Sequence, residues 1–391
     1  MPFFSPQTIQ SSWIFCAAIL IIAGTAAAEG RDQSDGSDRS SVNDPYTCAH
    51  LWQEIGLPQS HKPENQELGT AERDRLNAQI ADLNKRLETV DAIEAKKLKK
   101  ERNQLVRKAD IIQNSREQFE KTPRVNIVCR DHFITQYNSY TKNPDWVIER
   151  LDRETVTGTH NRPNKKFTRD PKLPIGAASA EDRDYGSSNL SRGHQAASAD
   201  FTSSEDWMKA TFVFSNAVPQ TQDGFNGGIW KDLEEHIQDL AKSLKDDEAI
   251  YVITGPVDMN VDGSEIVVDP DKNPCGKPIR LAGLSKLKKR SICDANDHHA
   301  DNICDHGVAV PSGLFKIIYS PHRDRAVGYL MSNEDHRNIH LRGISVTQYL
   351  EQQRASIDLI EDLSDLNFFT GKSQRWRRVH EESCPVQQWR Q

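Results

Sequence analysis

The sequence has no excess of positive charge. Its 50 Lys and Arg residues stand against 57 Asp and Glu residues, which gives a formal net charge of −7. This balance argues against a protein coated with basic residues for packaging nucleic acid, although it leaves room for a local phosphate-binding groove. The 391 residues are enough for one large domain with additions or for two ordinary domains.

No apolar run is long enough to favour a membrane span. The one candidate, residues 13–28 (WIFCAAILIIAGTAAA), falls short of the roughly 20 residues that a helix needs to cross a bilayer. It ends in three alanines that form an A-x-A cleavage site, so residues 1–28 are predicted to be a signal peptide. The segment before the run lacks the Lys or Arg of a typical signal, and an uncleaved anchor is the alternative. We expect a secreted or periplasmic chain with no stable membrane association after cleavage.

Cysteine is scarce. Seven cysteines occur, and removal of the signal peptide leaves six: Cys48, Cys129, Cys275, Cys293, Cys304 and Cys384. An even number in an exported chain predicts disulfides, with buried free thiols as the alternative. The sequence does not choose among the pairings that six cysteines allow.

Residues 70–121 contain neither glycine nor proline. Apolar residues there first follow the spacing of a coiled-coil seam and then continue in steps of seven, out of phase with the first series. The first series is Leu76, Ile80, Leu83, Leu87 and Val90, and the second is Leu98, Leu105, Ile112 and Phe119. Residues 91–94 form a capping box at the break. We predict a helical hairpin or coiled coil, with a single solvated helix as the alternative. It carries no catalytic residue, so it would serve packing or assembly, for example as a homodimer.

Beyond residue 122, short apolar runs and helical patterns follow one another without a regular βα repeat, which predicts an α+β domain. We expect this domain over residues 122–375, with an insertion at 258–309, a flexible linker before the hairpin at 29–69 and a C-terminal tail at 376–391. The expected strands are 125–128, 146–148, 211–214, 249–254 and 315–319, and the expected helices are 230–244 and 345–363.

Three segments carry side chains suited to phosphodiester chemistry. Residues 191–194 (SRGH) supply a histidine, whose usual pKa suits the removal of a proton from water. Arg192 can hold a phosphate oxygen with its planar guanidinium. Residues 215–220 (SNAVPQ) follow, and Asn226, expected to open a helix, offers an amide oxygen to a hard cation such as magnesium. Taken singly, each residue is more typical of a structural role; the combination is what indicates chemistry.

Together these segments resemble the DNA/RNA non-specific endonuclease family, the ββα-metal or His-Me finger nucleases that include endonuclease G. The D-R-G-H motif of that family corresponds to residues 191–194, its S-N-x-x-P-Q element to 215–220, and its N-x-x-x-W-x-x-L-E helix to 226–234. Flanking matches occur at 143–147, 251–257 and 310–316. The resemblance covers residues 122–370 and implies a central antiparallel sheet flanked by helices.

The resemblance also implies a role for each matching residue. His194 would be the general base, Asn226 would bind magnesium (or manganese in its place), and Glu234 would reach the water shell of the metal. Arg192 would contact the phosphate, and Asn216 would support the site. The implied function is a sugar-non-specific endonuclease that hydrolyses DNA and RNA. The alternatives are a catalytically impaired relative that binds nucleic acid or serves in assembly, and an effector toxin.

Two positions depart from the family pattern. Ser191 stands where the family usually has Asp, and Lys165 and Lys166 precede Phe167 where the family has an arginine. Lysine cannot make the bidentate contact of arginine. Strand alternation would turn Ser191 away from His194, so we expect an active nuclease despite this change.

The insertion offers one further set of metal ligands. A zinc site could be drawn from Cys275, Cys293, Cys304, His298, His299 and His306, and a calcium site from the neighbouring Asp and Asn residues. Their spacing matches no standard zinc pattern, so we expect a loop closed by disulfides. The basic run at 286–290 is either a phosphate-binding extension or a solvated charge cluster.

Overall fold

The computed structural model describes residues 45–60, 70–119, 125–185, 189–258, 264–283, 308–337 and 344–384. All of them belong to one compact unit, residues 40–391. The expected signal peptide lies outside these ranges. Within them, no helix combines the length and the apolar character needed to cross a bilayer.

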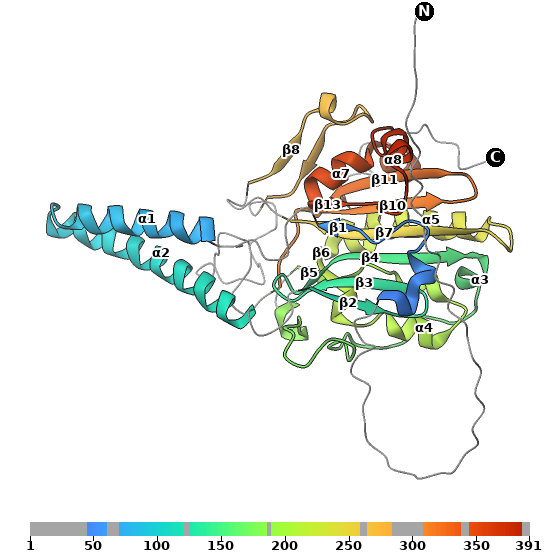
Figure 1. Cartoon of the computed structure of the whole chain (residues 1–391), viewed down its shortest axis with the longest axis horizontal. Helices are drawn as coiled ribbons and strands as arrows, with labels where there is room; N and C mark the ends of the chain where they lie inside the picture. The colour runs from blue at the N-terminus through green and yellow to red at the C-terminus, as the bar shows by residue number, and fades with distance from the viewer. Residues whose placement is uncertain are drawn as a thin grey trace, which may run out of the picture. The chain divides into compact units, whose positions relative to one another are not determined.

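The centre of the fold is a seven-stranded antiparallel sheet in the order β12-β11-β10-β7-β4-β3-β2, of which Figure 1 labels the strands from β11 to β2. Its strands are β2 (Val125–Cys129), β3 (Phe133–Asn138), β4 (Asn143–Asp152), β7 (Ala249–Val257), β10 (Gly313–Ser320), β11 (Arg325–Ser332) and β12 (Arg354–Ala355). The expected α+β class with a central antiparallel sheet is therefore confirmed.

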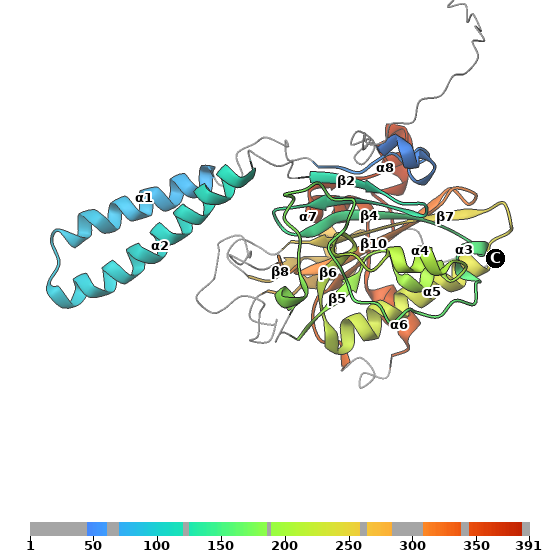
Figure 2. The same ribbon diagram turned by 90° about the horizontal axis from the view of Figure 1, so that it is seen from below.

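Both faces of the sheet are buried. Successive strand residues point to opposite sides, and each side is covered by its own core cluster. Val147 on β4 belongs to a core cluster that contains the apolar face of α5 (Trp230–Lys242). Its neighbour Ile148 belongs to a second cluster with η1 (Pro45–Leu51) and α7 (Ile357–Ser364). Figure 2 shows α4 and α5 on one side of the sheet and the blue η1 segment with α8 on the other. The side that carries α5 is the side of the candidate site.

The other elements connect these layers. The helices are α3 (Arg153–Val156), α4 (Glu205–Ala210), α6 (Val346–Gln352) and α8 (Gln374–His380), and the short helical turns are η2 (Asp182–Tyr185), η3 (Ser198–Phe201), η4 (Phe214–Asn216), η5 (Gln222–Ile229) and η6 (Pro270–Lys272). Three pairs of strands complete the fold: β1 (Gln59–Ser60) with β13 (Leu366–Asn367), β5 (Leu190–His194) with β6 (Ala217–Thr221), and β8 (Ile266–Val268) with β9 (Ile279–Leu281).

The expected helical hairpin is also confirmed. Helix α1 (Thr70–Leu87) and helix α2 (Ala92–Phe119) flank a short turn. The carboxylate of Asp91 accepts hydrogen bonds from the backbone N–H groups of Ile93 and Glu94 at 2.9 and 3.0 Å, which caps α2. Leu83 and Leu98 from the two expected apolar series are buried.

The expected linker and tail are partly wrong. Residues 45–60, placed in the linker at 29–69, pack on the sheet with Leu51 and Ile55 fully buried. The expected tail at 376–391 begins inside α8. In both segments a few apolar or disulfide-bonded side chains anchor a stretch whose overall composition is polar.

Two expected elements are interrupted. Residues 211–214 do not form a strand; Val213 makes only an isolated bridge to Thr168, because the aromatic rings of Phe212 and Phe214 pack beside Phe167 instead. The single helix expected over 345–363 is two helices, α6 and α7. The break lies at Arg354–Ala355, which pairs with β11, and Ser356 then caps α7 through the N–H of Leu359.

Four of the six expected cysteines form disulfides in the described part of the chain. Cys48 pairs with Cys129 and Cys275 with Cys384, which ties the N-terminal segment and α8 to the rest of the fold. Cys275 is therefore not a zinc ligand. The other ligands proposed for zinc or calcium, and the basic run at 286–290, lie outside the described residues.

Candidate active site

The candidate site is built on the β5–β6 hairpin and on the segment that leads into α5. β5 ends at His194, opposite Ala217 at the start of β6. The chain then passes through η5, which contains Asn226, and α5 begins at Trp230. Asn226 thus precedes α5 rather than opening it as expected. Gly224, with a φ of 75°, and Gly228 interrupt regular helical geometry on either side of it.

A cavity of about 880 Å³ collects most of the residues singled out in the sequence. Arg192 and His194 come from β5, Asn226 from η5 and Glu234 from α5. Asn216 does not line this cavity. Arg162, Lys165, Lys166, Ser191 and Lys231 line it as well, so five Lys and Arg side chains, counting Arg192, border the same cavity as His194.

His194 is held in an aromatic surrounding. Its ring centroid lies 4.6 Å from that of Phe167 and 4.8 Å from that of Phe212. Burial, and then the positive charge of Arg162, lower the pKa of His194 to about 3. The imidazole is therefore neutral near neutral pH, the state that a proton acceptor needs. Its buried Nε2 has no hydrogen-bond partner within the described chain.

Asn216 fixes the backbone just after His194. Its Oδ1 accepts from the N–H of Ala196 at 2.9 Å, while its Nδ2 donates to the carbonyls of Ala196 and Thr211, each at 3.0 Å. The carbonyl of Asn216 also accepts from the N–H of Gln195 at 2.9 Å. Fully buried and satisfied in this way, Asn216 acts on the site by positioning the chain that carries His194.

Gly193 is required by the packing between the two strands. A Cβ at this position would lie 2.0 Å from Cδ of Gln220, whose side chain is fully buried on β6. Any larger residue at 193 would push the strands apart and displace His194. The glycine in the S-R-G-H segment is thus explained by close approach rather than by a special backbone angle.

The two arginines beside His194, Arg192 and Arg162, differ in the side chains that they contact. Nε of Arg192 lies 2.8 Å from Oδ1 of Asp182, and its guanidinium stacks over the ring of Tyr185. Arg162 packs over Phe212, and its charge acts directly on His194. Arg162 therefore places a guanidinium at the cavity beside Lys165 and Lys166. Arg162 could not be found from the family motif, because it lies five residues before Phe167 rather than next to it.

Ser191 is directed toward β6 rather than toward His194. Its hydroxyl donates to the backbone carbonyl of Gln220 at 3.2 Å, although its residue borders the cavity. A carboxylate in its place would therefore reach the cavity without replacing any group in contact with His194.

We predict that Ser191→Asp changes the rate of cleavage, or the apparent affinity for magnesium, by no more than about 100-fold, the usual effect of a group that acts through a neighbour. Rates of the two proteins across a magnesium titration measure this. A silent wild type that Ser191→Asp activates would show instead that the missing carboxylate is essential.

Charged side chains lie buried beneath the cavity, and the sequence analysis did not identify them as a group. Glu149, Asp200 and Lys316 are each nearly or fully inaccessible to solvent. Nζ of Lys316 donates to Oγ1 of Thr254 at 2.9 Å and to the carbonyl of Gln195, next to His194, at 3.3 Å. Burial and the adjacent Asp200 raise the pKa of Glu149 well above its usual range. In the sequence, Glu149 and Lys316 could have been recognised as charged residues within or directly beside apolar runs that predict buried strands.

Glu234 lies above this buried group. Burial raises the pKa of its carboxyl to about 7, an effect that Lys316 opposes and Asp200 reinforces. A nearby divalent cation would favour the ionised carboxylate. Asn226 and Glu234 both line the cavity, with an amide and a carboxylate oxygen respectively, and oxygen ligands suit a hard cation. Within the described ranges, this site included, no group of three His, Cys, Asp or Glu side chains is arranged to hold a metal, so a cation here would keep several water ligands.

Comparisons with known proteins give a consistent result. The chain is 32% identical over 247 residues to the human protein named "Nuclease EXOG, mitochondrial", which covers 62% of this chain and 56% of the relative. It is 37% identical over 153 residues to the "Mitochondrial nuclease" of Saccharomyces cerevisiae, covering 39% and 42% of the two chains. The chain thus spans about half the length of these relatives. A solved structure of the EndoG/EndoGI complex is similar with a TM-score of 0.45 and 23% identity, over 64% of this chain and 88% of that one.

The expected secreted or periplasmic location is wrong by this comparison. Relatives from Xenopus laevis, Saccharomyces cerevisiae, human and mouse are all named as mitochondrial. The expectation rested on an apolar run and a cleavage pattern, yet the segment before the run lacks the basic residue of a secretory signal. An apolar run ending in small residues does not by itself distinguish one destination from another.

The family is established over most of the chain. A model described as DNA/RNA non-specific endonuclease matches residues 112–375, a range that contains every candidate site residue. The resemblance drawn from the motifs is confirmed, and so, at the level of the family, is the expectation of a nuclease enzyme. The chain belongs to the DNA/RNA non-specific endonuclease family.

Proposed function

We propose that this protein is a metal-dependent endonuclease that hydrolyses phosphodiester bonds in both DNA and RNA. The observation that carries the proposal is a neutral, buried imidazole in a cavity that is also lined by cationic side chains and by Asn226 and Glu234. The names of the relatives further favour a mitochondrial location.

His194 is the proposed general base. In the proposed reaction its imidazole takes a proton from the attacking water as that water bonds to phosphorus, the bond from phosphorus to the leaving ester oxygen breaks, and a solvent water returns a proton to that oxygen. Phe167 and Phe212 keep the ring in place and its charged form unfavourable. Asn216 and Gly193 hold the backbone on either side of it.

The cationic side chains that line the cavity are proposed to hold the substrate. Arg162 can make a bidentate contact with two non-bridging phosphate oxygens, whereas Lys165 and Lys166 act as point charges. Arg192 reaches the phosphate only if its pairing with Asp182 is exchanged for the substrate. We therefore assign the main phosphate contact to Arg162 and a supporting one to Arg192.

Magnesium, with manganese as the alternative, is the proposed metal. Asn226 would hold it directly through Oδ1, and Glu234 would hold one of its waters. When bound, it supplies stabilisation of the negative charge that develops on the phosphate and on the leaving oxygen.

A cleavage assay on supercoiled plasmid and on total RNA tests the proposal. We expect both substrates to be cut in the presence of magnesium and left intact when EDTA is in excess. If neither is cut at any magnesium or manganese concentration while the protein still retards nucleic acid in a gel, the alternative of a catalytically impaired, nucleic-acid-binding protein is correct.

A further inference from the structure

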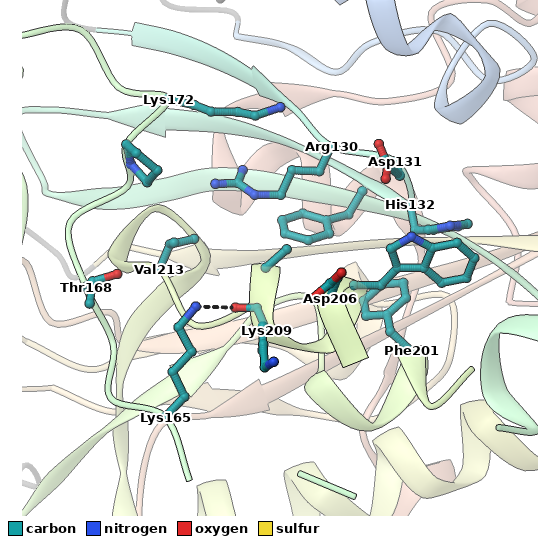
Figure 3. A pocket seen from close by; sticks show the side chains of 14 residues that line it. Arg130, Asp131, His132, Lys165, Thr168, Lys172, Phe201, Asp206, Lys209 and Val213 are labelled. Atoms are coloured by element: carbon teal, nitrogen blue, oxygen red, sulfur yellow. Dashed lines mark hydrogen bonds between the residues drawn. The ribbon is translucent and has the colours of Figure 1, made fainter. Parts of the chain in front are cut away.

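A second cavity, of about 380 Å³, shares the lining residue Lys165 with the active-site cavity and is shown in Figure 3. Residues 165–168 contribute to both cavities. Phe167 faces His194, whereas Thr168 borders the second cavity, and Lys165 borders both. Backbone hydrogen bonds from Thr168 to Phe212 and from Phe214 to Thr168, at 3.2 and 3.0 Å, hold this segment in place. The two cavities are therefore neighbours joined at Lys165.

The second cavity, which we call the Trp207 pocket, has an aromatic interior. Phe133, Phe201 and Trp207 line it, and the rings of His132 and Trp207 stand 3.5 Å apart between centroids. Val213 also lines it. Phe133 and Phe201 are almost inaccessible to solvent, so the partly exposed ring of Trp207 is the surface that suits a planar aromatic ligand.

Four cationic side chains border the Trp207 pocket: Arg130 and Lys172 come from one side and Lys165 and Lys209 from the other, as Figure 3 shows. Arg130 is paired with Asp170 and Lys209 with Glu205, so Lys165 and Lys172, which form none of the ion pairs found among the described residues, are the cations best placed to meet a phosphate. Nζ of Lys165 donates to the backbone carbonyl of Lys209 at 3.1 Å, so its ammonium lies at the boundary between the cavities.

The pocket is also held rigidly. The guanidinium of Arg130 contacts the buried carboxylate of Asp170 at 2.6 Å, and the same carboxylate accepts a short hydrogen bond from Ser215. Ser215 precedes Asn216, the residue that fixes the chain beyond His194. One network thus positions a wall of the pocket and the backbone of the active site.

We propose that the Trp207 pocket binds an unpaired base of the substrate strand close to the phosphate being cut. The inference rests on the proposed function, because it needs a nucleic-acid strand in the neighbouring cavity. Any base can stack on an aromatic side chain, and Lys165 and Lys172 on the rim can contact the phosphates that flank it. A base held in a duplex cannot enter without being unstacked, so the pocket favours single-stranded or distorted substrates.

Filling the pocket tests this inference. Thr168 is exposed and borders the pocket, so Thr168→Trp adds bulk there without disturbing the core. Thr347→Trp, at an exposed position on α6, is the matched control. Both are made in the His194→Ala protein, and binding of a fluorescent single-stranded oligonucleotide and of its blunt duplex is followed by anisotropy. Because this readout needs no cleavage, it remains informative if the proposed activity is absent.

We expect Thr168→Trp to weaken single-strand binding about tenfold, or about 1.4 kcal/mol, while duplex binding stays unchanged. The Thr347→Trp control should alter neither. Equal weakening for the duplex would mean that the pocket contacts a duplex backbone, and unchanged single-strand binding would mean that no base enters; either result overturns the proposal.

A second measurement avoids any substitution in the pocket. An oligonucleotide that carries 5-iodouracil is irradiated on the His194→Ala protein, and the adducts are located by peptide mass spectrometry. A base in the pocket should attach to Trp207 or His132, whose rings line it. Adducts found only elsewhere in the chain would overturn the proposal even if Thr168→Trp failed to fold.

Discussion

Replacing His194 with alanine is expected to lower the turnover number for plasmid cleavage by about 100- to 10,000-fold, the usual contribution of a general base. The structure gives the reason: burial keeps the imidazole unprotonated, with a pKa lowered to about 3, and the negative charge of a phosphate bound beside it would raise that pKa toward the neutral range in which a general base works. Nothing else in its immediate aromatic surrounding can accept a proton, because Phe167 and Phe212 carry no titratable group. The measurement is the initial rate at saturating magnesium.

A matched control is His322→Ala. His322 is exposed in the turn between β10 and β11 and pairs with Glu248 at 3.1 Å, away from the cavity, so its loss should leave the rate unchanged. Nucleic-acid binding should stay close to wild type in the His194 variant, because phosphate contacts are assigned to Arg162 and the lysines. A His194→Ala protein that kept more than about a tenth of the wild-type rate would exclude a general base at this position.

The central sheet could be anticipated because its strands carry their own signal. β7 and β10 are buried on both faces and consist mostly of apolar residues, and β4 contains the apolar run Trp146–Ile148. By contrast, residues 211–214 are also mostly apolar but do not form a strand, because Phe212 packs against His194 and Phe167. A local pattern reports burial, but it does not report which partner buries the side chain.

The helices show the same limit. The amphipathic pattern over 345–363 continues across a break, because Arg354 and Ala355 pair with β11 and Ser356 restarts a helix. That pairing joins segments more than 20 residues apart. The periodicity of apolar residues within one short stretch of sequence therefore cannot reveal it. The N-terminal segment was misjudged in a similar way: Cys48 and two apolar residues anchor a stretch that looks like a linker by composition.

The site could be predicted where its residues are close in sequence and could not where they are distant. His194, Asn216 and Asn226 fall within a single ββα unit, so motif spacing already places them together. Arg162 and Lys316 reach the site from outside that unit through tertiary packing. Their contribution is electrostatic, and it depends on burial, which the sequence does not display.

Replacing Asn226 with alanine should reduce magnesium-dependent cleavage at least about a thousandfold, since charge stabilisation by a bound metal contributes several kcal/mol to the transition state. Asn226 is the one protein group we assign to direct contact with the metal. The fold should persist, because Asn226 lies on the cavity wall in η5, a segment whose path is set by Phe225, Ile229 and the glycines around it. Thermal unfolding followed by circular dichroism checks this point, and cleavage rates across a magnesium titration measure the effect.

Two companion variants separate loss of the metal from a general disturbance. Glu234→Gln should lower activity or magnesium affinity by only about 10- to 100-fold, because its assigned contact runs through water. Asn103→Ala, on the exposed surface of α2, removes an amide far along the chain from the site and should change neither rate nor magnesium dependence. If Asn226→Ala kept the wild-type magnesium response, or if Glu234→Gln proved the more damaging of the two, the direct ligand would have to be Glu234 or another oxygen in this cavity.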